Sequence, residues 1–171
     1  MSRGVKILVT AITSVAGLLM FVPTASADTV EKSFNHVDLK YVESGLCSFD
    51  LSVHLDGSYK SVNYYDSSGF LYKTINTPGG GGPFTVTYAA HGITLTQRNE
   101  AFSELVIYHH DGTWTYTRRG PYAKFTVPGE GVVLLDTGIA AWAEPDDTLL
   151  FAHGPHHAVN GDFGAFCAAF G

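Results

Sequence analysis

Residues 47–65 read CSFDLSVHLDGSYKSVNYY, and this stretch decides the fold class. From Phe49 to Leu55 every second residue is apolar, and the residues between them are polar. An alternation of period two with one apolar face is typical of a half-buried β-strand. Asp-Gly between two such runs predicts a tight hairpin turn. The stretch therefore predicts two antiparallel strands joined at Asp56-Gly57.

Similar runs continue toward the C-terminus. β-Branched and aromatic segments alternate with turn signals at Asp66–Gly69, His91-Gly92 and Asp111-Gly112. The glycine-rich segment 77–83 interrupts them and is predicted to form a surface loop, because consecutive glycines do not hold a strand. About nine short strands at this spacing predict an all-β fold, an antiparallel β-sandwich or a barrel, of which we favour the sandwich.

The C-terminal sequence NGDFGAFCAAF (160–170) has a different periodicity. Phe163, Phe166 and Phe170 follow one another at spacings of three and four, which places them on one face of a short helix. Asp162 stands where a helix N-cap is expected. The fold should therefore end in a short C-terminal helix with an aromatic face.

The first 27 residues have the plan of a secretory signal. A positively charged start is followed by an almost uncharged apolar run, 7–22, and by the small residues Ala25-Ser26-Ala27. The apolar run is shorter than the roughly 20 residues of a membrane-spanning helix. We expect a signal peptide at 1–27, cleavage between Ala27 and Asp28, and a secreted, extracellular protein.

After cleavage the chain would form one β-rich globular domain. Residues 28–46 fit both a strand and a helix, so this N-terminal arm is left unassigned, although an edge strand is compatible with it. Residues 47–171 carry the clear strand pattern. A length of this order suits a single domain.

Charge and cysteine content restrict the function further. The full chain has a formal net charge of −6. An acidic protein disfavours nucleic acid, because phosphate binding depends on Lys and Arg. The two cysteines, Cys47 and Cys167, predict one structural disulfide in an exported protein. No second long apolar stretch in the sequence would span a membrane after removal of the signal.

The sequence HGPHH contains His153, His156 and His157, which are candidate metal ligands. Gly154-Pro155 opposes a helix, and neighbouring residues of an extended segment point to opposite faces. The run therefore supplies at most two ligands and needs another from elsewhere. Loop histidines without a metal are the favoured interpretation, and no cofactor is expected.

Aromatic residues are the other functional resource of the chain. A sheet face or loop rim of exposed tyrosine could bind carbohydrate or a protein partner, whereas the ordinary interpretation is packing within strands. No G-x-S-x-G motif is present, and no catalytic residue is assigned. The aromatic residues in or near predicted strands are Tyr59, Tyr64, Tyr65, Tyr72, Tyr88, Tyr108, Trp114, Tyr116 and Tyr122.

Three segments resemble a family of small exported actinobacterial proteins. They are CSFDLSVHLDGSYKSVNYYDSSG (47–69), YTRRGPYAKFTVPGEGVVLLDTG (116–138) and NGDFGAFCAAF (160–170). The resemblance covers most of residues 47–170 and implies export and an intact domain. The family is uncharacterised, without an established activity, so the resemblance transfers no functional site.

These observations favour a non-catalytic extracellular binding or interaction module over an enzyme. The alternative is a metal-dependent enzyme with a histidine-based site near residues 153–157. The partner itself is not identified by the sequence.

Overall fold

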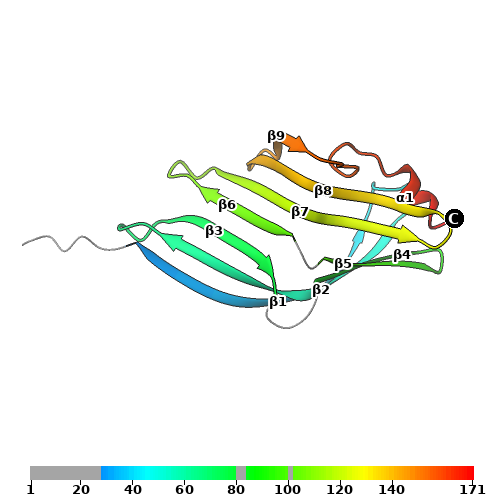
Figure 1. The fold of residues 1–171 in the computed structure, drawn as a ribbon, viewed down its shortest axis with the longest axis horizontal. Coiled ribbons are helices and arrows are strands. Elements are labelled where there is room, and N and C mark those ends of the chain that lie inside the picture. Colours follow the sequence, from blue (N-terminus) through cyan, green and yellow to red (C-terminus); the bar gives the residue numbers. More distant parts are fainter. Residues whose placement is uncertain (1–27, 80–83, 100–101) are drawn as a thin grey trace, which may run out of the picture.

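The computed structural model describes residues 28–79, 84–99 and 102–171 (Figure 1). The predicted signal peptide, with its cleavage site after Ala27, and most of the predicted glycine-rich loop lie outside the described residues. Within these ranges no helix is both long enough and apolar enough to cross a membrane.

The described residues form nine antiparallel strands and one short helix, which confirms the all-β prediction. The strands belong to one sheet that is not a closed barrel. Four strands have 14 or 15 residues and are longer than the short strands expected from the sequence. The elements are β1 Thr29–Glu43, β2 Leu51–Tyr65, β3 Leu71–Pro78, β4 Phe84–Ala90, β5 Ile93–Asn99, β6 Ser103–Tyr108, β7 Trp114–Val127, β8 Gly131–Glu144, β9 Thr148–His153 and α1 Gly164–Ala168.

The sheet branches at β2. One edge of β2 pairs with β1 along its whole length. The other edge pairs first with β4, over residues 52–56, and then with β3, over residues 59–65. From β3 the sheet continues through β6, β7 and β8 to β9, whereas β5 lies beyond β4. The Gln97 side chain of β5 reaches β7, where it accepts from Lys124 N at 2.6 Å and donates to Tyr122 O at 3.0 Å.

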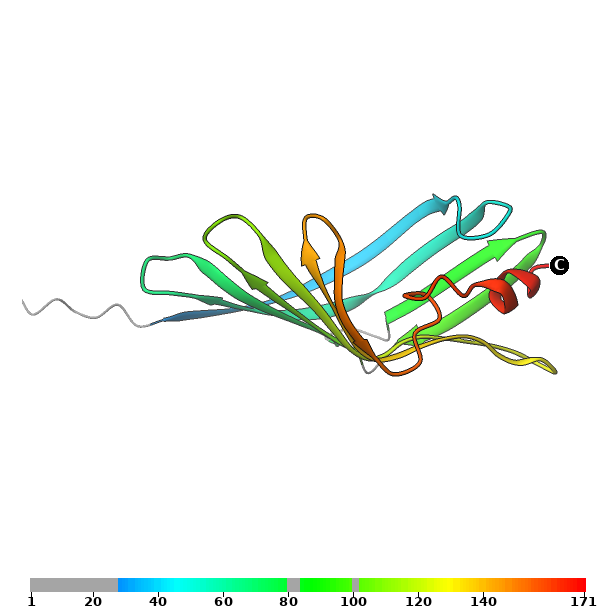
Figure 2. The same ribbon diagram turned by 90° about the horizontal axis from the view of Figure 1, so that it is seen from above.

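The hydrophobic core lies at the end of the sheet that holds α1. There the sheet curls so that α1 lies between the β1–β2 pair and the β7–β8 pair, which gives this end a sandwich-like arrangement (Figure 2). At the opposite end the hairpins β2–β3, β6–β7 and β8–β9 spread as a single layer (Figure 2). The core side chains include Leu51 and Val53 of β2, Phe125 of β7, Leu134 of β8, and Phe166 and Phe170 in and after α1.

The predicted hairpin at Asp56-Gly57 is wrong. Strand β2 runs straight through this dipeptide, and Asp56 and Gly57 pair with Asp38 and Val37 of β1. Gly57 does not adopt the positive φ of a hairpin turn. Its role is to allow a close approach, because a Cβ added there would lie 2.6 Å from the Cα of Phe84. Gly57 thus lies at the point where the strand paired with β2 changes from β4 to β3.

Replacing Gly57 with alanine should therefore destabilise the fold. The new methyl group would meet the backbone of Phe84 at 2.6 Å and its ring at 2.9 Å, so we expect a loss of about 2–3 kcal/mol in the free energy of unfolding. Denaturant titration would measure it. Gly164→Ala is the matched control, because a Cβ at Gly164 meets no atom within 4 Å. Equal stability of the two variants would contradict this account of Gly57.

Residues 29–43 of the arm left unassigned form β1, an edge strand that pairs only with β2. Two pairs of predicted strands are also merged in the structure. One pair forms β2, and the runs on either side of Gly120 form β7. Strand β7 changes register between Pro121 and Ala123, which leaves Tyr122 as an extra residue in a bulge. The total of nine strands therefore agrees with the prediction although several boundaries differ.

Three of the predicted turns are confirmed. Asp66–Gly69 joins β2 to β3, and the Asp66 carboxylate accepts from Ser68 N at 2.8 Å. His91-Gly92 joins β4 to β5, and Gly92 has a φ of 80°. In the turn between β6 and β7, Gly112 N donates to His109 O at 3.1 Å.

The predicted C-terminal helix and disulfide are also confirmed. Phe166 and Phe170 are fully buried, and the Phe166 ring lies 5.2 Å from that of Tyr88 and 5.3 Å from that of Phe125. Cys167 of α1 is bonded to Cys47, which fixes the helix to the segment before β2. The predicted cap is wrong: the N-cap residue is Phe163, and no side chain caps the helix, because α1 begins two residues after Asp162.

Candidate functional site: an aromatic and acidic hollow

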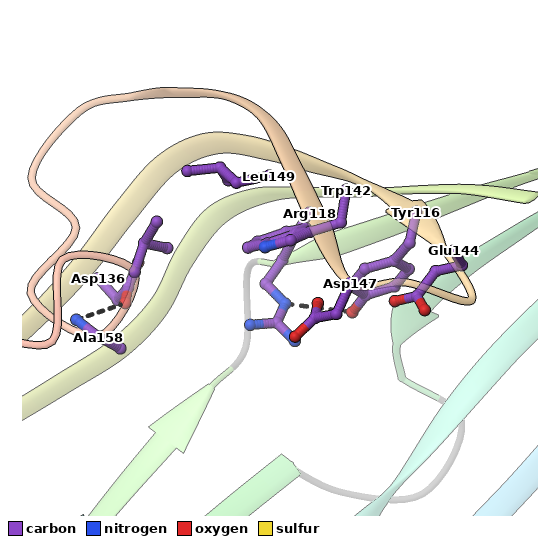
Figure 3. Close-up of a pocket in the computed structure, with 9 residues that line it drawn as sticks. Tyr116, Arg118, Asp136, Trp142, Glu144, Asp147, Leu149 and Ala158 are labelled. Carbon is purple, nitrogen blue, oxygen red and sulfur yellow. Dashed lines mark hydrogen bonds between the residues drawn. The ribbon is translucent and has the colours of Figure 1, made fainter.

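A wide hollow lies over β7 and β8, on the inner face of the sheet. We define the inner face as the face that carries Leu51 and Val53 of the core. Successive side chains of a strand point to opposite faces, so every second residue contributes. The hollow has a volume of about 530 Å³. It is lined by Tyr116, Arg118, Asp136, Trp142, Glu144, Asp147, Leu149, Ala158 and Val159, which Figure 3 draws as sticks.

Two aromatic rings and a guanidinium form the floor of this hollow. Tyr116 and Trp142 are direct partners in the β7–β8 register, and their ring centroids lie 5.8 Å apart at an interplanar angle of 33°. The Arg118 guanidinium carbon lies 5.6 Å from the Trp142 ring and 3.2 Å from the centroid of Tyr122. Cation–π contacts of this kind hold a cation in place over an aromatic surface.

The Tyr116 hydroxyl connects Arg118 to a carboxylate. It donates to Oε1 of Glu104 on β6, and it accepts from Nε of Arg118 at 3.1 Å. Burial is the largest cause that raises the pKa of Tyr116, so this hydroxyl stays protonated at neutral pH and remains a donor. The three side chains therefore have fixed orientations before any ligand binds.

Further side-chain hydrogen bonds extend from Glu104 across the sheet toward β1 and form a row of polar residues. Nδ2 of Asn76 on β3 donates to Oε2 of Glu104 at 3.5 Å, and Oδ1 of Asn76 accepts from Ser61 Oγ at 2.7 Å. Ser61 Oγ in turn accepts from Asn35 Nδ2 on β1 at 3.3 Å. This row joins five strands with side-chain hydrogen bonds and gives the inner face donors and acceptors beyond the hollow itself.

Two further carboxylates border the hollow. Glu144 ends β8, and Asp147 lies in the turn before β9; both side chains point toward the hollow that Arg118 enters (Figure 3). Within the described part of the chain, no Lys, Arg or His side chain lies within 4 Å of either carboxylate. These oxygens are therefore open to hydroxyl or ammonium groups of a ligand.

The loop 154–161 forms one wall of the hollow, and a buried pair holds it. Asp136 and His156 are 4% and 5% exposed, and His156 Nδ1 donates to Asp136 Oδ1 at 2.6 Å. Asp136 Oδ2 also accepts from Ala158 N at 3.1 Å. The remaining nitrogen, Nε2 of His156, lies 3.2 Å from the carbonyl oxygen of His153. Both imidazole nitrogens therefore face oxygen atoms of the protein.

This pair resembles the His–Asp part of a catalytic triad but lacks its function. In a triad the second imidazole nitrogen faces a nucleophile. Here that nitrogen faces the backbone of His153, so no nucleophile has access to it. The geometry indicates that His156 has a structural role.

The three predicted metal ligands do not converge. His156 is buried against Asp136, His153 is exposed beside Phe151, and His157 is half-buried. Among the residues that the structure describes, no group of three or more His, Cys, Asp or Glu side chains is placed to hold a metal ion.

The aromatic residues singled out from the sequence lie in different environments. Tyr116 and Tyr122 lie at hollows of the inner face, Tyr88 packs in the core, and Tyr64 lies beneath the Lys73 ammonium, 3.7 Å from Nζ. The sequence pattern did not single out four residues of the hollow: Arg118, Trp142, Glu144 and Asp147. A signal for Arg118 exists in TWTYTRR, where Trp114, Tyr116 and Arg118 alternate on one strand face.

Comparison with protein-family models, with curated proteins and with solved structures finds no match for this chain.

Proposed function

We propose that this protein is exported and acts outside the cell as a non-catalytic binding module with a carbohydrate ligand. The observation that carries the proposal is the pairing of Tyr116 and Trp142 with Arg118, Glu144 and Asp147 in one hollow. The C–H faces of a sugar ring pack on aromatic rings, and its hydroxyls pair with carboxylates and guanidinium groups. A few polar groups on an aromatic floor are the usual composition of such a site.

The other ligand classes fit this hollow less well. Nucleic acid would bring phosphates toward Glu144 and Asp147, and the chain is acidic overall. A hollow of about 530 Å³ suits a small ligand better than the flat face of a protein partner. Export is supported by the Cys47–Cys167 disulfide, because such bonds persist in oxidising compartments. Membership in the actinobacterial family remains part of the proposal.

A glycan microarray probed with the purified, oxidised protein tests this function. We expect a restricted set of glycans to bind. Trp142→Ala should weaken their binding by about 2 kcal/mol, roughly 30-fold in Kd, because buried aromatic anchors dominate binding energy. Titration calorimetry with one selected glycan measures the loss.

The matched control is Trp114→Ala. Trp114 is the other tryptophan of the chain, it begins β7, and it does not line the hollow. Binding should survive this change. The proposal is wrong if the array finds no glycan, or if both tryptophan variants lose affinity equally. Mass spectrometry of material from the culture fluid checks export, for which the expected first residue is Asp28.

A further inference from the structure

A second hollow of the inner face lies beside the core and is mainly apolar. It has a volume of about 250 Å³, is partly open to solvent and is lined mainly by residues of β2, β4, β7, β8 and the segment before α1. Its only buried amide side chain, Gln97, is already bonded to the backbone of β7. Burial raises the pKa of Tyr88 in its wall to about 12, so this hydroxyl is neutral. The walls include Leu55, Val86, Tyr88, Phe125, Leu134 and Phe163.

This hollow is partly open to solvent, so its apolar side chains are in contact with water. Burying apolar surface against an apolar ligand is favourable, and apolar walls hold water poorly. The chain nevertheless places this hollow directly beside its best-packed residues, such as Phe125 and Phe166. The geometry therefore favours an apolar occupant.

The apolar hollow lies next to the aromatic hollow, and Ala158 lines both of them. Leu55, Phe84 and Tyr122 line both the apolar hollow and a third space of about 260 Å³, which extends to Glu104. Glu104 receives the Tyr116 hydroxyl from the floor of the aromatic hollow. Tyr122 carries the Arg118 guanidinium on its ring. The stacked pair of Tyr122 and Arg118 thus stands between the aromatic hollow, which Arg118 lines, and the other two spaces, which Tyr122 lines.

We infer that the natural ligand is an amphiphile, with a sugar head in the aromatic hollow and an apolar tail that extends past Tyr122 into the apolar hollow. The position of the head rests on the proposed function, whereas the position of the tail is inferred independently from the apolar residues that line the second hollow. An anionic head is disfavoured, because Glu144 and Asp147 bring two carboxylates to a hollow in which Arg118 is the one Lys or Arg among the lining residues. The ligand class is that of an alkyl or acyl glycoside.

The tail site is tested with an apolar dye, N-phenyl-1-naphthylamine, which fluoresces strongly when removed from water. We expect saturable binding of one dye per protein. Val86→Phe adds bulk inside the hollow and should weaken this binding at least about tenfold. Val62→Phe is the matched control, because Val62 is a half-buried residue of β2 that does not line the hollow. Ala123→Leu fills the hollow from β7 and should reproduce the loss if Val86→Phe does not fold.

The link between head and tail is tested with two glycosides of the glycan that the array selects. The octyl glycoside, below its micellar concentration, should bind at least about tenfold more tightly than the methyl glycoside, since each buried methylene adds affinity. Equal affinities of the two glycosides, or no saturable dye binding by the native protein, would overturn the inference. Neither result would affect the proposal that the aromatic hollow binds a sugar. Conversely, dye binding without any glycan binding would refute the proposed function and the sugar head of the ligand, and it would support the apolar site for the tail. Trp142→Ala should leave the dye affinity unchanged.

Discussion

Replacing His156 with alanine is expected to lower the free energy of unfolding by about 3–5 kcal/mol. The imidazole of His156 is the hydrogen-bond partner of Asp136, and both side chains are buried. Removing one partner leaves a carboxylate inside the protein without its counterpart, which costs more than the pair contributes when intact. The loss should be measured by urea titration at neutral pH.

His157→Ala is the neighbouring control and should cost well under about 1 kcal/mol. The His157 side chain is half-buried, and its backbone N–H, which donates to Leu135 O, is unaffected by the change. Asp136→Ala and the double variant complete a cycle in which the two single losses should not add. Additive losses would show that the two residues act independently, contrary to the contact described above.

The same substitution should also weaken ligand binding. Ala158 and Val159 form part of the aromatic hollow, and Asp136 holds Ala158 through its backbone N–H. Without His156 the wall of the hollow loses one of its fixed points. Binding should therefore fall even under conditions where the variant remains folded, and the loss should be smaller than that of Trp142→Ala.

Removing the Cys47–Cys167 disulfide is the second change with a large expected effect. The bond joins residues 120 positions apart. In the chain-entropy model, a crosslink of this span stabilises the fold by about 5 kcal/mol, because it restricts the unfolded chain. That is a large part of the total stability of an ordinary domain. The double variant Cys47→Ser with Cys167→Ser should therefore melt at a much lower temperature.

The reductant provides the control for this experiment. Dithiothreitol should destabilise the native protein to about the level of the double variant and should leave the variant itself unchanged. The sequence has two cysteines, and both belong to this bond, so no other disulfide complicates the comparison. A melting temperature of the native protein that does not respond to reductant would contradict a stabilising role of the bond.

The sequence predicts local features of this fold well. The turns at Asp66–Gly69, His91-Gly92 and Asp111-Gly112 and the helix around Phe166 depend on neighbouring residues, and all are found. The disulfide could be predicted because two cysteines can form only one intramolecular bond. Local chemistry determines these elements, so they can be recognised without knowledge of the remaining chain.

Features that depend on distant segments could not be recognised. Asp56-Gly57 has the residues of a hairpin turn, yet β1 pairs across it and Phe84 packs against it. An ambiguous N-terminal arm gave no indication that it would be the strand that holds β2 straight. Tertiary pairing thus outweighs the local turn preference here.

The candidate site was hidden for the same reason. Trp142 lies within a mainly apolar run, where burial in the core is the natural expectation. Its contact with Tyr116 and Arg118 arises only from the register of β7 and β8. The bulge that turns Tyr122 toward Arg118 is likewise not visible in the sequence. The aromatic residues could be named in advance, but their meeting point could not.

The concentration of buried side chains at the α1 end means that resistance to local opening should vary along the molecule. Where α1 and the disulfide hold two layers together, backbone amides should exchange with solvent only when the whole domain unfolds. The single-layered tips of β2–β3, β6–β7 and β8–β9 have less to hold them and should exchange through small fluctuations. The protein thus combines an anchor that stays rigid with a rim that can adjust its shape, and the aromatic hollow lies between the two.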